Sequence, residues 1–364
     1  MSNRRAIPES TPSLPGLNGP GDAGEIVIDA FAGGGGASAG IEAALGRPVD
    51  VAINHDHAAV ALHKANHPRT THHCRSIYDV SPEAVARGRP VGLLWASPDC
   101  THFSRAKGGQ PVTRGIRDLP WTVVEYARRV QPRVIILENV PDFLTWGPLD
   151  DGRPCPRRRG ETFRAWVARL RGLGYRVDWR TIRACDHGAP TIRERLFVVA
   201  RRDGRPVRWP SRTHGDPEAL PVRQGELAPW PTAADVVDWH RPCPSIFLDR
   251  EQARAHGVNR PLAEATMRRI AHGVMRHVVQ TARPFIVPVT HTRSPRREKP
   301  VDAPLNTVST ARGGEFALVA PYLAQHNTGV VGRDARVPVS TVLATGSHQA
   351  AVAARLAPTD DDLA

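Results

Sequence analysis

IVIDAFAGGGGASAG, residues 26–40, is the stretch that decides the expected fold. An apolar run at 26–32 fits a buried strand, four glycines follow at 33–36, and a helical pattern begins at 38–45. Glycines at such a turn let the backbone approach a ligand, and the start of the helix supplies amide donors. The stretch indicates a nucleotide-like cofactor. A hydride-transfer Rossmann enzyme and a plain glycine-rich turn are the alternatives, although the glycine spacing is not a clean G-x-G-x-x-G.

The rest of the first half of the chain repeats this strand–helix pattern. Further short apolar runs occur at 49–55, 91–97, 133–139 and 195–201, and helical patterns at 58–66, 121–130 and 161–173. Short apolar strands separated by helices predict an α/β fold with a parallel sheet covered on both faces. Ligands of such sheets bind beyond the carboxyl ends of the strands.

The character of the sequence changes after about residue 203, where Pro, Arg and His become frequent and only one helix is expected, at 262–280. We therefore expect a smaller, irregular second domain. The expected divisions are a disordered leader at 1–24, a cofactor-binding domain at 25–202, the second domain at 203–330 and a C-terminal segment at 331–364.

Composition indicates a polyanionic partner. The formal net charge is +13, which makes DNA or RNA the default partner. Only three of the 49 basic residues are lysine, so the arginine bias of a GC-rich genome is the alternative explanation. The five cysteines form no CxxC pair, and neither a signal peptide nor a long apolar run is seen, which favours a cytoplasmic protein without a membrane span. No metal site is expected, because the cluster at 72–74 lacks a second half-site.

Polar residues follow the second and third expected strands. Asn54, His55 and Asp56 end the second, where a polar side chain can bind ribose hydroxyls; turn-forming loop residues are the alternative. Cys100, in SPDCTHFS (97–104), follows the third and can be held there as a thiolate nucleophile, whereas a structural cysteine is the commoner reading of a lone Cys.

Two further motifs lie at later strand ends. Glu138 in LENVP directly follows a strand, where partial burial lets it act as an acid; the alternative is an edge glutamate bonded to backbone. Arg193 and Arg195 flank the start of the last strand with alternate spacing, so both are expected on one side, facing a phosphate or a base carbonyl. A salt bridge to Glu138 is the alternative for this pair.

In this order, the motifs resemble those of the DNA (cytosine-5)-methyltransferase family, and the chain looks most like its phage and prophage members. The resemblance covers about residues 26–200 and rests on Asp29 to Gly40, on Cys100-x-x-Phe103-Ser104, on Glu138-Asn139-Val140 and on Arg193-x-Arg195. It implies a Rossmann-like S-adenosylmethionine-dependent methyltransferase sheet with a smaller, irregular target-recognition domain. The implied catalytic residues are Cys100, Glu138, Arg193 and Arg195. The implied cofactor-binding residues are Asp29, Phe31, Ala32, Gly33, Gly35, Asn54, His55, Asp56, Ser76, Ile77 and Pro98.

The resemblance also implies the reaction. Cys100 would add to carbon 6 of a flipped cytosine in double-stranded DNA, Glu138 would bind ring nitrogen 3, and carbon 5 would take the methyl group. Arg195, with Arg193, would hold the base carbonyl or a nearby phosphate. A monomeric enzyme of a restriction–modification system, in a bacterium or a phage-infected host, is expected.

The sequence departs from the family pattern in three places. Asp99 and Thr101 stand where proline and glutamine are usual, and an acidic neighbour disfavours a thiolate at Cys100. Asn54 stands where the family has glutamate. The late Gly-Asn-x-Val-Pro-like closing segment is not found. A truncated or split enzyme with a second polypeptide, a non-catalytic DNA-binding relative and an RNA cytosine methyltransferase are therefore the alternatives.

Overall fold

The computed structural model describes residues 24–99, 118–150, 153–236, 244–274, 285–288, 298–306, 316–325, 333–334 and 349–354. The chain divides into two compact units. The first contains the residues up to Ile182 together with Glu194–Ser211, and the second contains Arg183–Arg193 together with the residues from Arg212 onward. The segment 183–193 therefore interrupts the first unit in sequence and belongs to the second. The leader expected at 1–24 lies outside the described residues except for Gly24.

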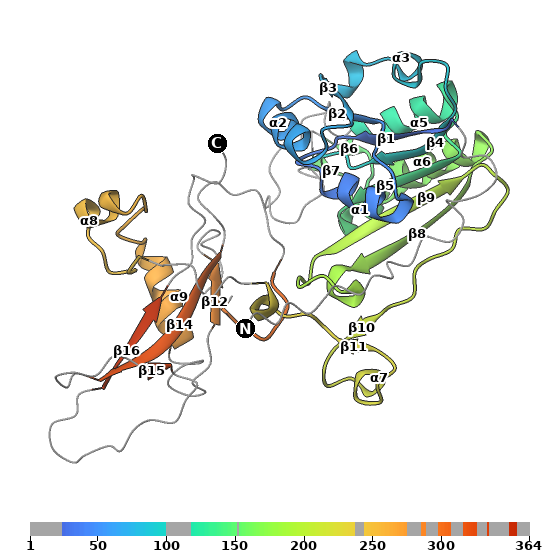
Figure 1. Ribbon diagram of the computed structural model, residues 1–364. Helices are drawn as coiled ribbons and strands as arrows, with labels where there is room; N and C mark the ends of the chain where they lie inside the picture. Colours follow the sequence, from blue (N-terminus) through green and yellow to red (C-terminus); the bar gives the residue numbers. More distant parts are fainter. Residues whose placement is uncertain are drawn as a thin grey trace. The chain divides into compact units, whose positions relative to one another are not determined.

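A seven-stranded sheet forms the centre of the first unit, in the order β3-β2-β1-β4-β5-β9-β8 (Figure 1). The strands are β1 (Ile26–Ala30), β2 (Val51–Asn54), β3 (Thr71–Cys74), β4 (Val91–Ala96), β5 (Val134–Asn139), β8 (Arg176–Arg183) and β9 (Glu194–Arg201). The pairs from β3 to β5 are parallel, whereas β9 runs antiparallel to β5. The carboxyl ends of five parallel strands therefore meet at one edge.

Helices alternate with the parallel strands. They are α1 (Gly36–Leu45), α2 (His57–Asn66), α3 (Pro82–Ala86), α5 (Leu119–Arg129) and α6 (Glu161–Gly172), with short 3-10 turns η1 (Ile77–Asp79), η3 (Pro141–Thr145) and η4 (Pro156–Arg158). Local sequence fixes several of their starts. Asp56 caps α2 by accepting from the amide of Ala59 at 2.8 Å, and Ser81 caps α3 with Pro82 in the first turn.

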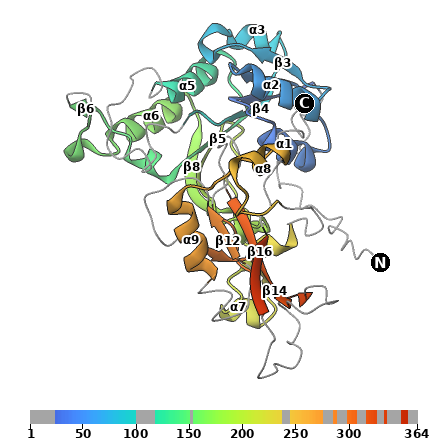
Figure 2. The same cartoon turned by 90° about the vertical axis from the view of Figure 1, so that its left-hand side faces the viewer.

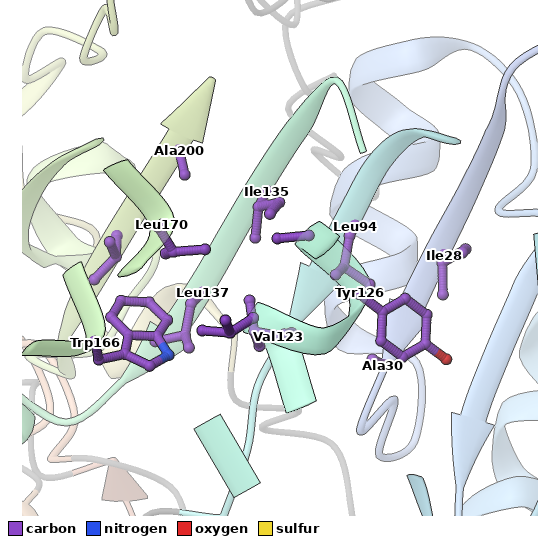
Figure 3. Packing of buried hydrophobic residues seen from close by; sticks show 14 of the residues in the cluster. Ile28, Ala30, Leu94, Val123, Tyr126, Ile135, Leu137, Trp166, Leu170 and Ala200 are labelled. Atoms are coloured by element: carbon purple, nitrogen blue, oxygen red, sulfur yellow. The ribbon is translucent and has the colours of Figure 1, made fainter. Parts of the chain in front are cut away.

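The sheet buries apolar side chains on both faces. On one face Val27, Leu93 and Val134 pack with Ile41 of α1. On the other face, residues of α5 and α6 pack against the alternate strand residues, as Figure 3 shows; among them are Ile28, Leu94, Val123, Tyr126, Ile135, Leu137, Trp166 and Leu170. The indole nitrogen of buried Trp166 donates to the carbonyl of Pro120 at 2.8 Å, so its one polar atom is satisfied. Full burial of each large side chain contributes about 1.5–3 kcal/mol.

The α/β class and the five apolar strands are confirmed, but the expectation of a wholly parallel sheet is wrong for the last strand. The chain enters β9 from β8 through a 3-10 turn, η5 (Ala184–His187), and a short loop rather than through a crossover helix, and parallel neighbours need such a crossover. Sequence analysis missed β3 and β8 because THHC and RVDWRTIR carry no apolar run. Both lie at the outer edges of the sheet, where almost all of their side chains are exposed or only partly buried.

The second unit contains a small mixed assembly. Its elements are β10 (His214–Gly215), α7 (Leu220–Arg223), β11 (Ala228–Pro229), η6 (Ala233–Asp235), α8 (Arg250–Ala255), α9 (Glu264–Val274), β12 (Phe285–Pro288), β13 (Lys299–Pro300), β14 (Phe316–Gln325), β15 (Arg333–Asp334) and β16 (Gln349–Ala354). The helix expected at 262–280 is found as α9, and residues 275–280 lie outside the described ranges. Segment 183–193 is tied into this unit, since the amide of Ile192 donates to Leu305 at 2.7 Å. Of the helices described in either unit, none is long and apolar enough to cross a membrane.

Gly147 offers a test of the packing beside α6. A Cβ added there would lie 2.2 Å from the backbone oxygen of Arg158, so Gly147→Ala must displace main chain. We expect a loss of about 1–3 kcal/mol in the free energy of unfolding, measured by urea titration. Gly172→Ala is the control, because a Cβ at that helical position meets nothing within 4 Å and the change should be neutral or stabilising by up to about 1 kcal/mol. Equal effects of the two substitutions would contradict this packing.

Candidate active site

The glycine turn follows β1 and is held in a conformation that few residues adopt. Phe31 has a φ of 65° and Gly35, which precedes α1, has a φ of 101°. A Cβ at Gly35 would also lie 2.5 Å from Nε2 of His67, so both backbone conformation and space require glycine there. Strained residues such as Phe31 concentrate at ligand sites. The turn predicted from sequence is therefore present, with α1 starting directly after it.

A buried polar network lies beneath this turn. Asp29 is fully buried and its Oδ2 accepts a hydrogen bond of 2.7 Å from the Ser38 hydroxyl. The same hydroxyl oxygen lies 3.1 Å from Nε2 of His63, whose Nδ1 is 2.9 Å from Nε2 of His72. The other carboxyl oxygen of Asp29 has no hydrogen-bond partner among the described residues. Four elements, β1, α1, α2 and β3, are thus joined under the glycines.

His67 connects α2 to the turn itself. Its Nε2 lies 3.1 Å from the carbonyl oxygen of Gly35, and its Nδ1 lies 3.1 Å from the carboxylate of Glu42 in α1. Sequence analysis missed Ser38, His63 and His67. The available signal was the four-residue spacing of the two histidines, which puts both on one face of α2.

The residues predicted to bind ribose already have local partners. The side-chain oxygen of Asn54 accepts from the amide of Asp56 at 2.8 Å, and Asp56 caps α2, which lowers the pKa of its carboxyl through the hydrogen bond from Ala59. His55 is exposed. All three stand at the carboxyl end of β2, as expected from the sequence. One side-chain oxygen of Asn54 and one of Asp56 already accept hydrogen bonds from backbone amides.

The remaining predicted cofactor residues lie at neighbouring strand ends. Ser76 precedes η1, just after β3, and accepts weakly from the amide of Tyr78 at 3.4 Å. Ile77 is only 8% exposed and packs into the hydrophobic core, so its side chain is not open to a ligand. Ala32 is buried, and its amide donates to the carbonyl of Ile53 at 3.0 Å.

Three hydrogen bonds tie the end of β4 to its neighbours. The amide of Ser97 donates to Ala30 at 3.2 Å and its hydroxyl donates to the carbonyl of Phe31 at 3.4 Å. On the other side, the side-chain nitrogen Nδ2 of Asn139 donates to the carbonyl of Pro98 at 3.2 Å. Cys100 and the residues from 101 to 117 lie outside the described ranges. The residues leading to Cys100 are therefore bonded both to the glycine turn and to the end of β5.

Glu138 and Arg195 are brought together. Nε of Arg195 lies 3.5 Å from Oε1 of Glu138, and the two side chains are 17% and 24% exposed. This is the salt bridge that the sequence left open as an alternative. Arg193 precedes β9 and belongs to the second unit, where its carbonyl accepts from the amide of Ala184 at 2.9 Å. The strand alternation expected for the arginine pair does not apply, because β9 begins at Glu194.

The described ranges hold no group of three His, Cys, Asp or Glu side chains that could bind a metal ion. What they bring together at the carboxyl edge is a glycine turn, an acid with its arginine, and the residues that lead into Cys100. This edge of the sheet therefore combines a glycine turn with a carboxyl group and a guanidinium group.

Asp29 predicts a measurable pH dependence. Burial raises the pKa of its carboxyl to about 7, although the hydrogen bond from Ser38 by itself lowers that pKa. The folded protein thus favours the protonated form, and this contribution to stability is lost as pH rises from the ordinary value of 3.8 through about 7. Asp29→Asn should remove that loss, so its stability relative to wild type should rise by about 2–3 kcal/mol between pH 5 and pH 8 in chemical denaturation. Parallel stability curves for the two proteins would show the carboxyl to be charged in the fold.

Known proteins are similar to parts of this chain. The family model for C-5 cytosine-specific DNA methylase matches residues 26–236. The chain is 31% identical over 208 residues to the type II methyltransferase M.SacI of Streptomyces achromogenes, covering 52% of this chain and 50% of that protein. It is 26% identical over 221 residues to M.AquIA of Picosynechococcus sp., covering 58% and 87%.

A solved structure of a Spodoptera frugiperda DNMT2 mutant is also similar, with 16% identity, a TM-score of 0.46 and coverage of 68% of this chain and 65% of that one. A crystal structure described as a prophage-encoded DNA modification methyltransferase of E. coli has 25% identity, a TM-score of 0.40 and coverage of 49% and 46%. The chain spans half the length of M.SacI. Since residues 26–236 make up more than half of its 364 residues, the chain belongs to the C-5 cytosine-specific DNA methylase family.

Proposed function

We propose that this chain transfers a methyl group from S-adenosylmethionine to carbon 5 of cytosine in a specific sequence of duplex DNA, with Cys100 as the nucleophile. The observation that carries the proposal is the pair of bonds that hold the residues before Cys100. Ser97 donates to Phe31 in the glycine turn, and Asn139, the residue after Glu138, donates to Pro98. The residues that precede Cys100 thus belong to the same edge of the sheet as Glu138 and the glycine turn.

The glycine turn fits the proposed cofactor. A Cβ at Gly33 would meet nothing within 4 Å, so the turn is open on that side. Gly35 caps α1 without a side-chain hydrogen bond, which leaves the first amides of the helix as donors for a carboxylate or hydroxyl. The orphaned oxygen of Asp29 beneath the turn and the polar end of β2 at Asn54 add hydrogen-bonding groups. S-adenosylmethionine would supply an electrophilic methyl group on a sulfonium.

The chain's own residues would do the remaining chemistry. The thiolate of Cys100 adds to carbon 6, which moves electron density to carbon 5 so that it can accept the methyl group. The carboxyl of Glu138, in its protonated form, donates to ring nitrogen 3 and so neutralises the negative charge that develops there. A base then removes the proton of carbon 5, and the electron pair of that bond expels Cys100. Arg195, 3.5 Å from Glu138, orients the carboxyl and faces the base carbonyl.

Methyl transfer tests the proposal directly. The full chain is incubated with S-adenosylmethionine carrying a labelled methyl group and with mixed-sequence DNA or tRNA, and the labelled base is identified by mass. We expect 5-methylcytosine in DNA. Cys100→Ser should lower the rate at least 1,000-fold because the thiolate is lost, and Glu138→Gln should lower it roughly 100- to 10,000-fold.

Cys74→Ser is the matched control, because it makes the same chemical change in another cysteine. Cys74 is the last residue of β3, and its sulfur lies 3.4 Å from Nδ1 of His57. This variant should keep most of the activity. Label in tRNA alone, no label, or equal losses for the two cysteine variants would overturn the proposal. Bisulfite sequencing of DNA from cells that express the chain then gives the target sequence.

A further inference from the structure

A basic segment in the first unit has no part in the site described so far. It is a hairpin of β6 (Leu149–Asp150) and β7 (Arg153–Pro154), followed by η4. Figure 2 shows β6 beside α6. The segment RPCPRRRG at 153–160 exposes four arginines. One of them, Arg158, pairs with Asp150 at 3.0 Å. Arg153, Arg157 and Arg159 make no ion pair with any described residue, and we call these three the hairpin arginines.

Backbone contacts hold this segment in place. The amide of Cys155 donates to the carbonyl of Pro148 at 3.0 Å, and Gly147 packs so closely on the backbone of Arg158 that a Cβ would clash. The amide of Phe163 donates to Trp146 at 3.0 Å. Beside the segment is a cavity of about 240 Å³, lined by Trp121, Trp146 and Asp118 among others. These main-chain contacts hold the segment at Cys155 and Arg158, between which Arg157 lies.

The segment follows β5 and Glu138 in the sequence, and none of its residues belongs to the proposed catalytic set. The 3-10 turn η3 starts two residues after Asn139, the last residue of β5, and ends one residue before Trp146.

We infer that the hairpin arginines bind the phosphates of the duplex DNA substrate, on the first unit and outside the target-recognition domain. Guanidinium groups pair with phosphate through two parallel hydrogen bonds, and they keep their charge at any working pH. Where the backbone is already held by its own contacts, only the arginine side chains must be ordered when they bind phosphate. Such contacts carry no sequence information and serve to anchor the duplex. The inference rests on the proposed function for its choice of DNA as partner.

The test uses the full chain and a fluorescein-labelled 30-base-pair duplex of arbitrary sequence, because phosphate contacts do not depend on the target. Anisotropy gives Kd at several KCl concentrations. The variant is R153Q/R157Q/R159Q, and the matched control is R69Q/R169Q/R176Q. The control arginines are exposed and have no ion-pair partner in the described ranges. Arg69 precedes β3, Arg169 lies in the last turn of α6, and Arg176 begins β8. Next to Arg176, the hydroxyl of Tyr175 donates to the carbonyl of Pro132 at 2.8 Å, just before β5 begins. The control arginines thus mark the opposite edge of the sheet.

We expect the slope of log Kd against log salt to fall by about 0.9 for each lost phosphate contact, hence by about 2–3 in the hairpin variant, with a Kd at least tenfold weaker at low salt. The control should keep the wild-type slope. The maximal methylation rate at saturating DNA should stay within about twofold of wild type, since no hairpin arginine belongs to the catalytic set.

An unchanged slope in the hairpin variant, an equal change in the control, or no binding of the duplex by wild type would overturn the inference. Unlabelled tRNA is also added as a competitor of the labelled duplex. If it displaces the duplex from wild type but not from a hairpin variant that still binds DNA, the inference is overturned as well. If wild type binds the duplex with the expected slope and transfers no methyl group, the proposed function fails while the binding surface stands.

Discussion

The hydrogen bond from the side chain of Asn139 to the carbonyl of Pro98 is the constraint on which the proposed site depends. Both residues are buried, so an unpaired amide or carbonyl there would cost about 1–3 kcal/mol. The bond fixes where the chain leaves β4 relative to the end of β5, and Ser97 repeats the connection toward the glycine turn. Glu138 thereby keeps one position relative to the residues that precede Cys100, which is what a two-residue mechanism requires.

Beneath this edge, buried polar groups connect the glycine turn to the helices that follow it. Asp29, Ser38 and His63 bond in sequence inside the fold, and His67 reaches the carbonyl of Gly35. Burial lowers the pKa of His63 to about 4, so the imidazole is neutral at ordinary pH and the network avoids a buried cation. A network of this kind specifies one backbone arrangement more sharply than apolar contacts would, because each donor has few alternative partners.

Sequence reasoning predicted those parts of the fold that depend on apolar periodicity. The five apolar strands and helices α1, α2, α5 and α6 were found because their buried residues form runs or stripes. Strands β3 and β8 were missed because edge strands need no such run, and the direction of β9 was wrong because it depends on the length of a connection. In the site, the positions of the glycines and of Glu138 could be predicted from the sequence because these residues lie at the ends of apolar strands. The contacts of His63 and His67 could not, because they join residues across elements. Arg193 and Arg195 were paired by spacing, yet a unit boundary falls between them.

Covalent trapping at Cys100 tests the central claim most directly. DNA made with 5-fluorocytosine at every cytosine presents the target whatever its sequence. A fluorine on carbon 5 cannot leave as a proton does, so thiolate addition followed by methylation leaves the sulfur bonded to carbon 6. With S-adenosylmethionine present, we predict a denaturant-resistant protein–DNA complex whose peptide map places the bond at Cys100, and no complex with Cys100→Ser. A bond at another cysteine, or no complex with DNA that wild type binds, would contradict the account.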